Sequence, residues 1–569
     1  MSTAISLLGG VGLFLLGMTV MTEGLKSPAG SALRAMLTKA ATPLHGSFWG
    51  AVVTLLVQSS RATTATTIGL VSAGLLTLPQ GLGLVFGANV GTTGTAWLVA
   101  LIGVRVSLTA AALPMIFVGA LTKLLARGRT ARMGAALAGF GLLLLGLTTL
   151  QQGMGGLAER LHPADLPAVL GAPDVRWWSG LFGVLVLVVI GLLMTALMQS
   201  STAAVAVTLS GHYAGAIGLD QACALIIGQN LGAATSSVLA AFGASTTAKR
   251  LSIAYVLFKL IAALIALVLF PVVVPRLLRA SSTVDGVTLL AGYHTAYNVV
   301  GVMVLLPLVN WFTRLVERIL PEGGSPLTRC LDSSALASPI VAVEAVRRAI
   351  ALVLVTVCAS VEAALTGRAK PVRLGKDAVS VQQAADALRQ AELFLSDMTG
   401  PPDTDEEQRR LTSTLRALDR ASRLTDLANG GVNFSSVRDG PEDIRAGELC
   451  AEVMRTAAAI ARGVAAPPRV AGSPQIVPAS RGEDAMAGPR AIPPDEAIAE
   501  LERCTTQLDE VLRTHRSATL GAVANGMLTA DAALLRIETI RNLEALSQHA
   551  WRSAIHLVGR GERGKQDYG

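Results

Sequence analysis

The chain has 569 residues, of which 51% are hydrophobic, 15% charged and only 4% aromatic. Soluble domains average about 25% charged residues, so this composition excludes a wholly soluble protein and favours packed membrane helices rich in small side chains. The net charge of +8 arises in residues 1–328, which hold 18 of the 47 basic residues but only 8 of the 39 acidic ones. Basic loops beside membrane segments explain this excess without a nucleic-acid partner.

Nine apolar runs in the first 320 residues approach the roughly 20 residues that an α-helix needs to cross a bilayer. No basic segment precedes the first run, so we interpret it as a membrane helix and not as a signal peptide. Two runs, 46–76 and 178–217, are too long for one crossing, and each is predicted to be two helical arms that meet at a polar block. The runs are 5–22, 46–76, 80–103, 107–125, 134–151, 178–217, 222–243, 251–275 and 288–312.

The polar blocks belong to an internal duplication. The first block is Gln-Ser-Ser-Arg-Ala-Thr-Thr at 58–64, and Gln-Ser-Ser-Thr-Ala-Ala at 199–204 repeats it 141 positions later. Three blocks recur in the same order, namely 12–17 at 141–146, 58–64 at 199–204, and 87–93 at 228–234. We therefore predict two membrane repeats, at residues 1–128 and 129–320.

Basic residues predict the orientation in the membrane. Lys123, Arg127, Arg129 and Arg132 lie together between the repeats without a nearby acid, which is typical of a cytoplasmic loop. Arg314 and Arg318 follow the last run, and these basic residues indicate a cytoplasmic location for that end as well. The mixed loop 159–176 is expected to lie outside. The C-terminal part is accordingly predicted to be cytoplasmic.

Residues 321–339 are predicted to be a linker that leads to a soluble helical domain at 340–560. Apolar residues at spacings of three and four predict helices at 340–365, 374–399, 405–429, 442–465, 494–515 and 517–558. The apolar run 350–358 is interpreted as too short to span a bilayer. Residues 466–493 are rich in Pro, Gly and Ala and are predicted to be a flexible insert. The five scattered cysteines predict neither a disulfide framework nor a zinc site.

Polar residues at membrane depth must lie where protein or water surrounds them. Helix breaks there supply half-helix N-termini that attract anions, and freed carbonyls that hold a small cation. The hydroxyls of Ser59, Ser60, Thr63 and Thr64, with those of Ser200, Ser201 and Thr202, suit a tetrahedral oxyanion or Na⁺. Ordinary packing of small residues in membrane helices is the alternative. Gln58 and Gln199 are predicted to brace the breaks.

Two cations stand out within apolar runs. Arg61 has no acid near it in sequence, and its guanidinium matches phosphate bidentately. Either a substrate anion or Glu23 of the first helix is its predicted partner. Lys259 is either a second buried cation, which would strengthen anion binding or replace a cation, or a side chain that snorkels towards the interface, and snorkelling is the favoured prediction.

The paired Gln-Ser-Ser blocks, each followed by Gly-x-Asn-x-Gly, resemble the sodium-dependent inorganic phosphate cotransporter family (type II), whose bacterial members continue into a PhoU-like helical domain. The segment 294–298, His-Thr-Ala-Tyr-Asn, resembles a further pattern of that family. The resemblance implies an all-α, polytopic fold of two inverted repeats that contain broken or re-entrant helices. It also implies Na⁺ and phosphate sites at the repeat interface. Arg61 and Lys259 depart from the family, where Ser and Asn are usual.

Residues 423–426, Arg-Leu-Thr-Asp, resemble part of a PhoU helix, but Ser422 replaces an expected Glu. Metal binding by this domain is therefore not predicted. The predicted phosphate ligands are Ser59, Ser60, Arg61, Thr63, Thr64, Ser200, Ser201 and Thr202. The predicted helix-break scaffold or sodium ligands are Gln58, Gln199, Asn89, Gly91, Thr92, Thr93, Asn230, Gly232 and Asn298.

The sequence thus predicts a phosphate transporter of the bacterial inner membrane, coupled to Na⁺ and working by alternating access. It has no catalytic residues and no cofactor besides this coupling ion, and its cytosolic helices regulate it or bind a partner protein. Two alternatives remain at this point: a transporter or exporter of another anion, and a membrane phosphate sensor that signals through the C-terminal helices. An intramembrane hydrolase would need a nucleophile and base pair, and the blocks contain none.

Overall fold

The computed structural model describes most of the chain, and the statements below concern the described residues. They divide into two compact units, one of residues 1–71 and 76–322 and one of residues 72–75 and 323–569. The described residues are 2–38, 41–103, 108–160, 162–170, 176–241, 245–321, 325–367, 372–374, 377–398, 400, 404–430, 441–466 and 494–559.

The first unit consists of helices, as the composition predicts. Its α-helices are α1 (Ser2–Thr38), α2 (Pro43–Val57), α3 (Ser60–Ser72), α4 (Leu78–Thr92), α5 (Gly94–Gly103), α6 (Leu108–Leu125), α7 (Gly128–Ala158), α8 (Trp177–Met198), α9 (Ser201–Tyr213), α10 (Leu219–Gly232), α11 (Ala234–Ala241), α12 (Thr246–Ala280), α13 (Gly286–Leu305) and α14 (Val309–Ile319). A short 3₁₀ helix, η1 (Pro163–Asp165), lies between α7 and α8.

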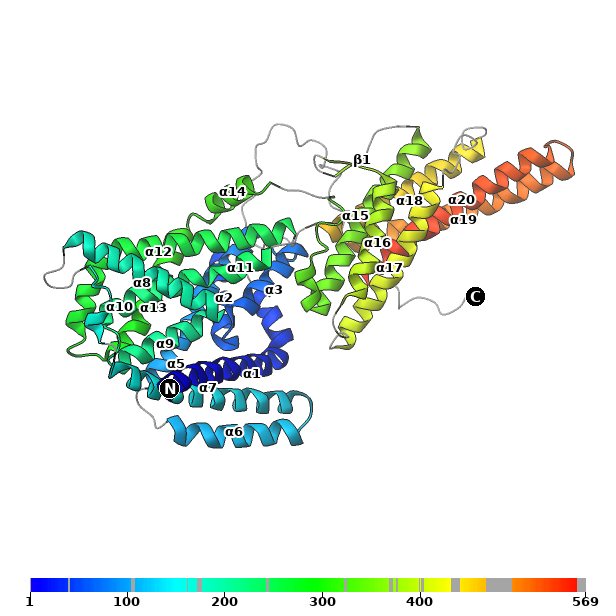
Figure 1. The fold of residues 1–569 in the computed structure, drawn as a ribbon. Coiled ribbons are helices and arrows are strands. Elements are labelled where there is room, and N and C mark those ends of the chain that lie inside the picture. The colour runs from blue at the N-terminus through cyan, green and yellow to red at the C-terminus, as the bar shows by residue number, and fades with distance from the viewer. Residues whose placement is uncertain are drawn as a thin grey trace. The chain divides into compact units, whose positions relative to one another are not determined.

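Helices α1, α7 and α6 lie side by side (Figure 1). Glycines bring α1 and α7 together, because a Cβ on Gly17 would lie 2.3 Å from the backbone nitrogen of Leu143, and one on Gly146 would lie 2.4 Å from that of Phe14. These residues belong to the echoed blocks 12–17 and 141–146, which therefore pack against each other. Small residues permit such close packing of membrane helices.

Both long apolar runs consist of two helices that meet at the Gln-Ser-Ser block. Helix α2 ends before Gln58 and α3 begins at Ser60, while α8 ends before Gln199 and α9 begins at Ser201. The next helices, α4 and α10, also begin 141 positions apart. The runs 80–103 and 222–243, predicted as single spans, are each divided as well, at Thr93 and at Ala233.

The duplicated segments also repeat their packing. A Cβ on Gly87 would lie 1.8 Å from the carbonyl oxygen of Ser47, and one on Gly228 would lie 1.9 Å from that of Val188. Ser47 and Val188 are themselves 141 positions apart. Helix α4 therefore packs on α2 as α10 packs on α8. The inverted relation of the two repeats in the membrane stays a prediction.

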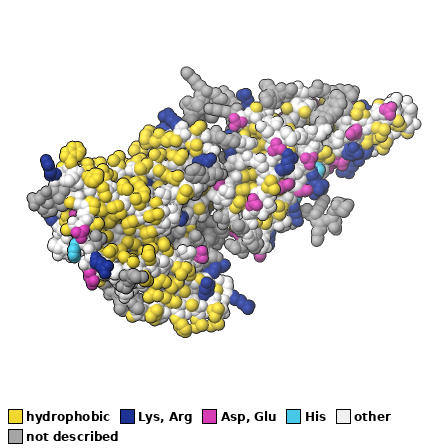
Figure 2. Space-filling view, in the orientation of Figure 1, with side chains coloured by type: hydrophobic (Ala, Val, Ile, Leu, Met, Phe, Trp, Pro, Cys, Tyr) yellow, Lys and Arg dark blue, Asp and Glu magenta, His cyan; other side chains and the backbone are white. Residues whose placement is uncertain are grey.

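The first unit is suited to a lipid environment. Among the described residues, eight helical segments are long and apolar enough to cross a membrane, and seven of them belong to this unit. Two of the seven, 78–101 and 219–239, each run through a pair of consecutive helices, α4 with α5 and α10 with α11. Large hydrophobic side chains such as Phe48, Phe182, Leu264 and Val268 are exposed on it, and Figure 2 shows hydrophobic side chains over much of its visible face. The chain is thus a polytopic helical membrane protein.

The second unit is a helical bundle with one small hairpin. Its elements are η2 (Ser333–Ala337), α15 (Pro339–Thr366), β1 (Val372–Leu374), β2 (Asp377–Val379), α16 (Val381–Ser396), α17 (Asp405–Asn429), α18 (Pro441–Ala465), α19 (Pro494–Ala524) and α20 (Ala530–Val558). The strands pair antiparallel. Helix α15 is central, packing on α16, α17, α18 and α20, and the five cysteines of the chain are buried and unpaired.

Three predictions for this unit need correction. The helix predicted at 374–399 begins only at Val381, because strands β1 and β2 precede it. The run 350–358 lies in the 28-residue helix α15, which is apolar and long enough to span a bilayer, although its apolar side chains form the core of the bundle. Helix α19 continues to Ala524 because the turn follows at Asn525 and Gly526, where φ is +70°. The predicted flexible insert, 466–493, lies outside the described residues apart from position 466, and the PhoU-like nature of the bundle stays a prediction.

Candidate functional site

Each Gln-Ser-Ser block ends one helix and starts the next. The backbone of Gln58 (φ 56°, ψ 29°) and of Gln199 (φ 51°, ψ 24°) adopts the left-handed conformation. This conformation costs a non-glycine residue about 1–2 kcal/mol. The Gln58 amide Nε2 donates to the carbonyl of Leu55 at 2.5 Å, and the Gln199 amide donates to that of Ala196 at 2.6 Å. The two side chains thus satisfy carbonyls freed at the breaks.

The serine after each glutamine caps the following helix. Ser59 Oγ accepts a hydrogen bond from the backbone N–H of Ala62 at 3.3 Å, and Ser200 Oγ accepts one from Ala203 at 3.2 Å. Such capping still leaves other first-turn N–H groups without a helical partner. The N-termini of α3 and α9 therefore offer donors and partial positive charge to an anion.

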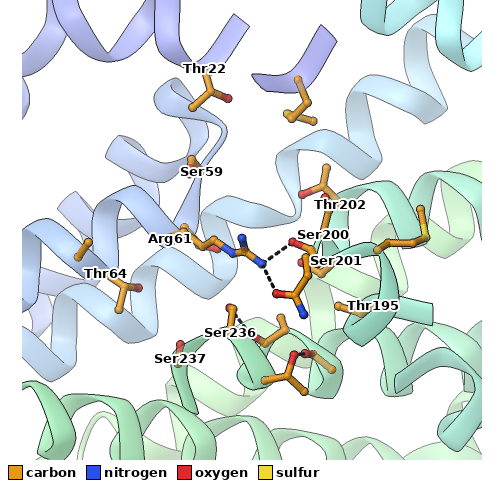
Figure 3. Close-up of a pocket in the computed structure, with 18 of the residues that line it drawn as sticks. Thr22, Ser59, Arg61, Thr64, Thr195, Ser200, Ser201, Thr202, Ser236 and Ser237 are labelled. Carbon is orange, nitrogen blue, oxygen red and sulfur yellow. Dashed lines mark hydrogen bonds between the residues drawn. The ribbon is translucent and has the colours of Figure 1, made fainter. Parts of the chain in front are cut away.

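One cavity of about 710 Å³ joins the two breaks. It lies within the first unit, between residues of α1, α3, α9, α12 and the α10–α11 junction. Figure 3 shows hydroxyl side chains from both breaks pointing towards the same space. Its lining includes most of the predicted ligands and both glutamines, namely Gln58, Ser59, Ser60, Arg61, Thr64, Gln199, Ser200, Ser201, Thr202 and Gly232.

Arg61 links the two breaks across the cavity (Figure 3). Its Nη2 donates to the backbone carbonyl of Gln199 and, at 3.2 Å, to the side-chain Oε1 of the same residue. No ion pair joins Arg61 to Glu23 in the described chain, although both residues line the cavity. The guanidinium is exposed to the cavity, and its Nε and Nη1 donors have no protein partner among the described residues. They remain available to an anion.

Thr63 requires a correction, because it does not line the cavity. Its hydroxyl accepts from Thr54 at 2.9 Å and donates to the Ser59 carbonyl at 3.3 Å, with the side chain only 2% exposed. Thr63 therefore joins α3 to α2 at the break and does not line the cavity.

The first Gly-x-Asn block does not line the cavity. Asn89 donates to the carbonyl of Val85 at 3.0 Å, and Gly91 packs on α2. The hydroxyls of Thr92 and Thr93 donate to backbone carbonyls of their own segment. These residues shape the helices that carry the breaks.

Asn230, Asn298 and Lys259 form a buried cluster next to the cavity. The Lys259 ammonium donates to Asn230 Oδ1, and Asn230 Nδ2 donates to Asn298 Oδ1 at 3.2 Å. Lys259 is 2% exposed. The prediction that it snorkels was wrong, because a neutral amide oxygen holds its ammonium inside the protein.

Several lining residues were not predicted from the sequence. They are polar residues that a ligand could contact, and they come from four different helices: Thr22, Thr195, Ser236, Ser237 and Ser252. Ser236 and Ser237 follow the second Gly-x-Asn block, and this proximity is a signal that could have found them. Thr22 and Ser252 are single hydroxyls in apolar helices, which the sequence does not distinguish from packing residues.

Comparison with known proteins decides the family. The family described as Na⁺/Pi-cotransporter matches residues 13–152 and 183–281. The uncharacterised protein YqeW of Bacillus subtilis is 30% identical over 314 residues, which cover 54% of this chain and 95% of YqeW. The chain belongs to the Na⁺/Pi-cotransporter family.

Two other relatives of the chain have names that state a function. The "Putative inorganic phosphate export protein YjbB" of Escherichia coli K12 is 29% identical over 348 residues, covering 60% of this chain and 61% of YjbB. The human "Sodium-dependent phosphate transport protein 2B" is 44% identical over 62 residues, covering 11% of this chain and 9% of its own length. No solved structure matches the chain. The family match includes both breaks, Asn230 and Lys259, whereas Asn298 follows its last residue.

Proposed function

We propose that the chain transports inorganic phosphate across the bilayer through the cavity between the two breaks, with Na⁺ as the coupling ion. The observation that supports this most directly is Arg61, whose Nε and Nη1 donors face a cavity lined by hydroxyls from both breaks. Membership of a transporter family supports transport rather than catalysis.

The donor set suits phosphate. A tetrahedral oxyanion accepts hydrogen bonds in several directions, and the cavity offers serine and threonine hydroxyls, two helix N-termini and one guanidinium. Na⁺ prefers neutral oxygens, which the same hydroxyls and the carbonyls freed at the breaks provide. The predicted phosphate ligands that line the cavity are Ser59, Ser60, Arg61, Thr64, Ser200, Ser201 and Thr202.

Alternating access around this cavity is the mechanism that we propose. Each break belongs to one of two segments whose helix bounds and glycine contacts recur at an offset of 141. Movement of one segment against the other would open the cavity to each side in turn, as in transporters built from repeats. Arg61 bonds to Gln199 across the two segments, so an anion that competes for this guanidinium also affects their contact.

We also propose that the protein lies in a bacterial inner membrane with the second unit in the cytoplasm. The basic segment with Lys123, Arg127, Arg129 and Arg132 supports this orientation. The second unit, as a PhoU-like regulatory bundle, would bind a cytosolic partner protein. Cysteine accessibility at position 129 in intact and permeabilised cells tests the orientation.

Phosphate flux is the decisive experiment. Purified protein in liposomes should take up radiolabelled phosphate faster under an inward Na⁺ gradient than with K⁺ alone, and protein-free liposomes give the background. Unlabelled sulfate should compete poorly, whereas strong competition would favour a transporter of another anion. Saturable phosphate binding with no flux in either direction would refute transport and favour the sensor. Loading phosphate inside the liposomes measures export in the same preparation.

A further inference from the structure

Lys259 is a buried cation within a helix that is apolar and long enough to cross a membrane. It lies in α12 with 2% of its surface exposed, and its Nζ is 5.4 Å from the centre of the Tyr255 ring. Among the described residues no carboxylate forms an ion pair with it. A charged residue at such depth is costly and therefore usually functional.

The ammonium donates to a neutral amide oxygen, which begins a short chain of buried hydrogen bonds. Asn230 Oδ1 accepts from Lys259, Asn298 Oδ1 accepts from Asn230, and the His294 carbonyl accepts from Asn298 at 2.8 Å. These three residues are at most 5% exposed. Amide and carbonyl oxygens without a carboxylate are ligands that suit a monovalent cation, and the lysine supplies one.

The cluster lies directly behind the cavity wall but not in it. Ser252 and Tyr255, which precede Lys259 by seven and four positions on one face of α12, line the cavity. Gly232, two residues after Asn230, lines it too. Lys259 itself does not. Its ammonium is therefore placed to stabilise an anion in the cavity through space and not as a direct ligand.

We propose that the Lys259 ammonium is a resident cation that takes the place of one monovalent coupling ion in the second repeat. This inference rests on the proposed phosphate transport. A tethered charge does not dissociate, so it offsets part of the phosphate charge at every Na⁺ concentration. Transport should consequently need one Na⁺ fewer than it would with a neutral residue at this position.

The test replaces the resident charge with an oxygen ligand. Lys259→Asn supplies an amide like that of Asn298 and leaves room for an ion. We expect it to move about one more ²²Na⁺ per phosphate than the wild type, with a steeper dependence of flux on Na⁺, because a free ion then fills the cluster. Lys259→Met provides neither charge nor ligand and should lose most phosphate flux at every Na⁺ concentration. Lys249→Asn, on the same helix outside the cluster, should match the wild type.

The possible outcomes separate this inference from the proposed function. If the wild type neither binds nor moves phosphate, the proposed function fails. If the wild type transports phosphate but Lys259→Asn has the same Na⁺ to phosphate ratio, the resident-cation proposal is wrong. An unchanged flux in Lys259→Met also overturns it. Should Lys259→Asn not fold, Lys259→Gln tests the same ratio with a longer amide, and the same ratio as the wild type in that variant refutes the proposal.

Discussion

Replacing Arg61 with alanine removes the one basic side chain among the described residues that line the cavity. In the wild type its Nη2 bonds to Gln199, and Nε and Nη1 are left for an anion. A hydrogen bond to a charged group contributes about 1.5–3 kcal/mol, and water in the cavity screens the pair. We therefore expect a loss of about 2–3 kcal/mol, which corresponds to roughly a 30- to 150-fold increase in the Kd for phosphate.

Equilibrium binding of radiolabelled phosphate to the purified protein measures this change. Arg61→Lys keeps the charge but not the planar fork, so its Kd should rise by roughly tenfold and lie between the other two proteins. Arg276→Ala is the matched control, because Arg276 is exposed on α12 and donates to the carbonyl of Val272, away from the cavity. Its Kd should equal that of the wild type.

The Arg61→Ala substitution also distinguishes a ligand-binding role of Arg61 from a structural one. Without Arg61 the Gln199 carbonyl can bond to water in the cavity, so the melting temperature should change little. An unchanged Kd together with a clearly lower melting temperature would refute the reasoning. Arg61 would then serve to hold the two breaks together, and the anion would have to bind to the hydroxyls and helix N-termini alone.

Two further changes test the framework of the site, and a third tests the second unit. Gly228→Ala should lower the melting temperature strongly, because its Cβ would lie 1.9 Å from a carbonyl oxygen of α8, whereas Gly12→Ala meets nothing within 4 Å and should be neutral. Gln199→Val should be less stable than Gln199→Gly by about 1–2 kcal/mol, as measured by thermal unfolding, because only glycine tolerates φ 51° without strain. In α20, burial and then neighbouring arginines lower the pKa of His556 below 6.5. Its stabilising contribution is therefore complete above pH 6.5 and lost as the pH falls. The protection of α20 amides against hydrogen exchange, corrected for the intrinsic pH dependence of the exchange rate, should fall on acidification, and less so in His556→Asn.

The sequence predicts the positions of the breaks because their cause is local. A Gln-Ser-Ser block inside an apolar run supplies a capping serine and a polar side chain for freed carbonyls, and both features are visible without tertiary information. The duplication supplied the partner break by its offset alone. Conversely, the wrong prediction for Lys259 depended on Asn230, which lies on another helix, and no pattern within α12 indicates that contact.

For Thr63 and Ser236, too, the sequence alone does not show whether the side-chain hydroxyl faces the cavity. Thr63 and Thr64 are neighbours in one block, but α3 turns the first towards Thr54 and the second towards the cavity. Helical rotation of about 100° per residue decides this, and it requires the position of the neighbouring helix. Ser236 follows the second Gly-x-Asn block, so its neighbourhood is visible in the sequence, but the junction at Ala233 that brings it to the cavity lies inside a segment predicted as one span.

The duplicated scaffold carries charges that are not duplicated. Position 61 is arginine in the first break, and the residue 141 positions later is Thr202, although the helix bounds on both sides agree. The second repeat has its cation in Lys259, behind the wall instead of in the cavity. Because the Arg61 guanidinium bonds to Gln199, its charge lies at the second break, so an anion held by Nε and Nη1 should bind off-centre, near Ser200 and Ser201. Thr202→Arg would make the breaks alike, and phosphate bound between two guanidinium groups should dissociate more slowly. We expect this variant to bind phosphate more tightly but to transport it more slowly, and faster transport would contradict an off-centre site.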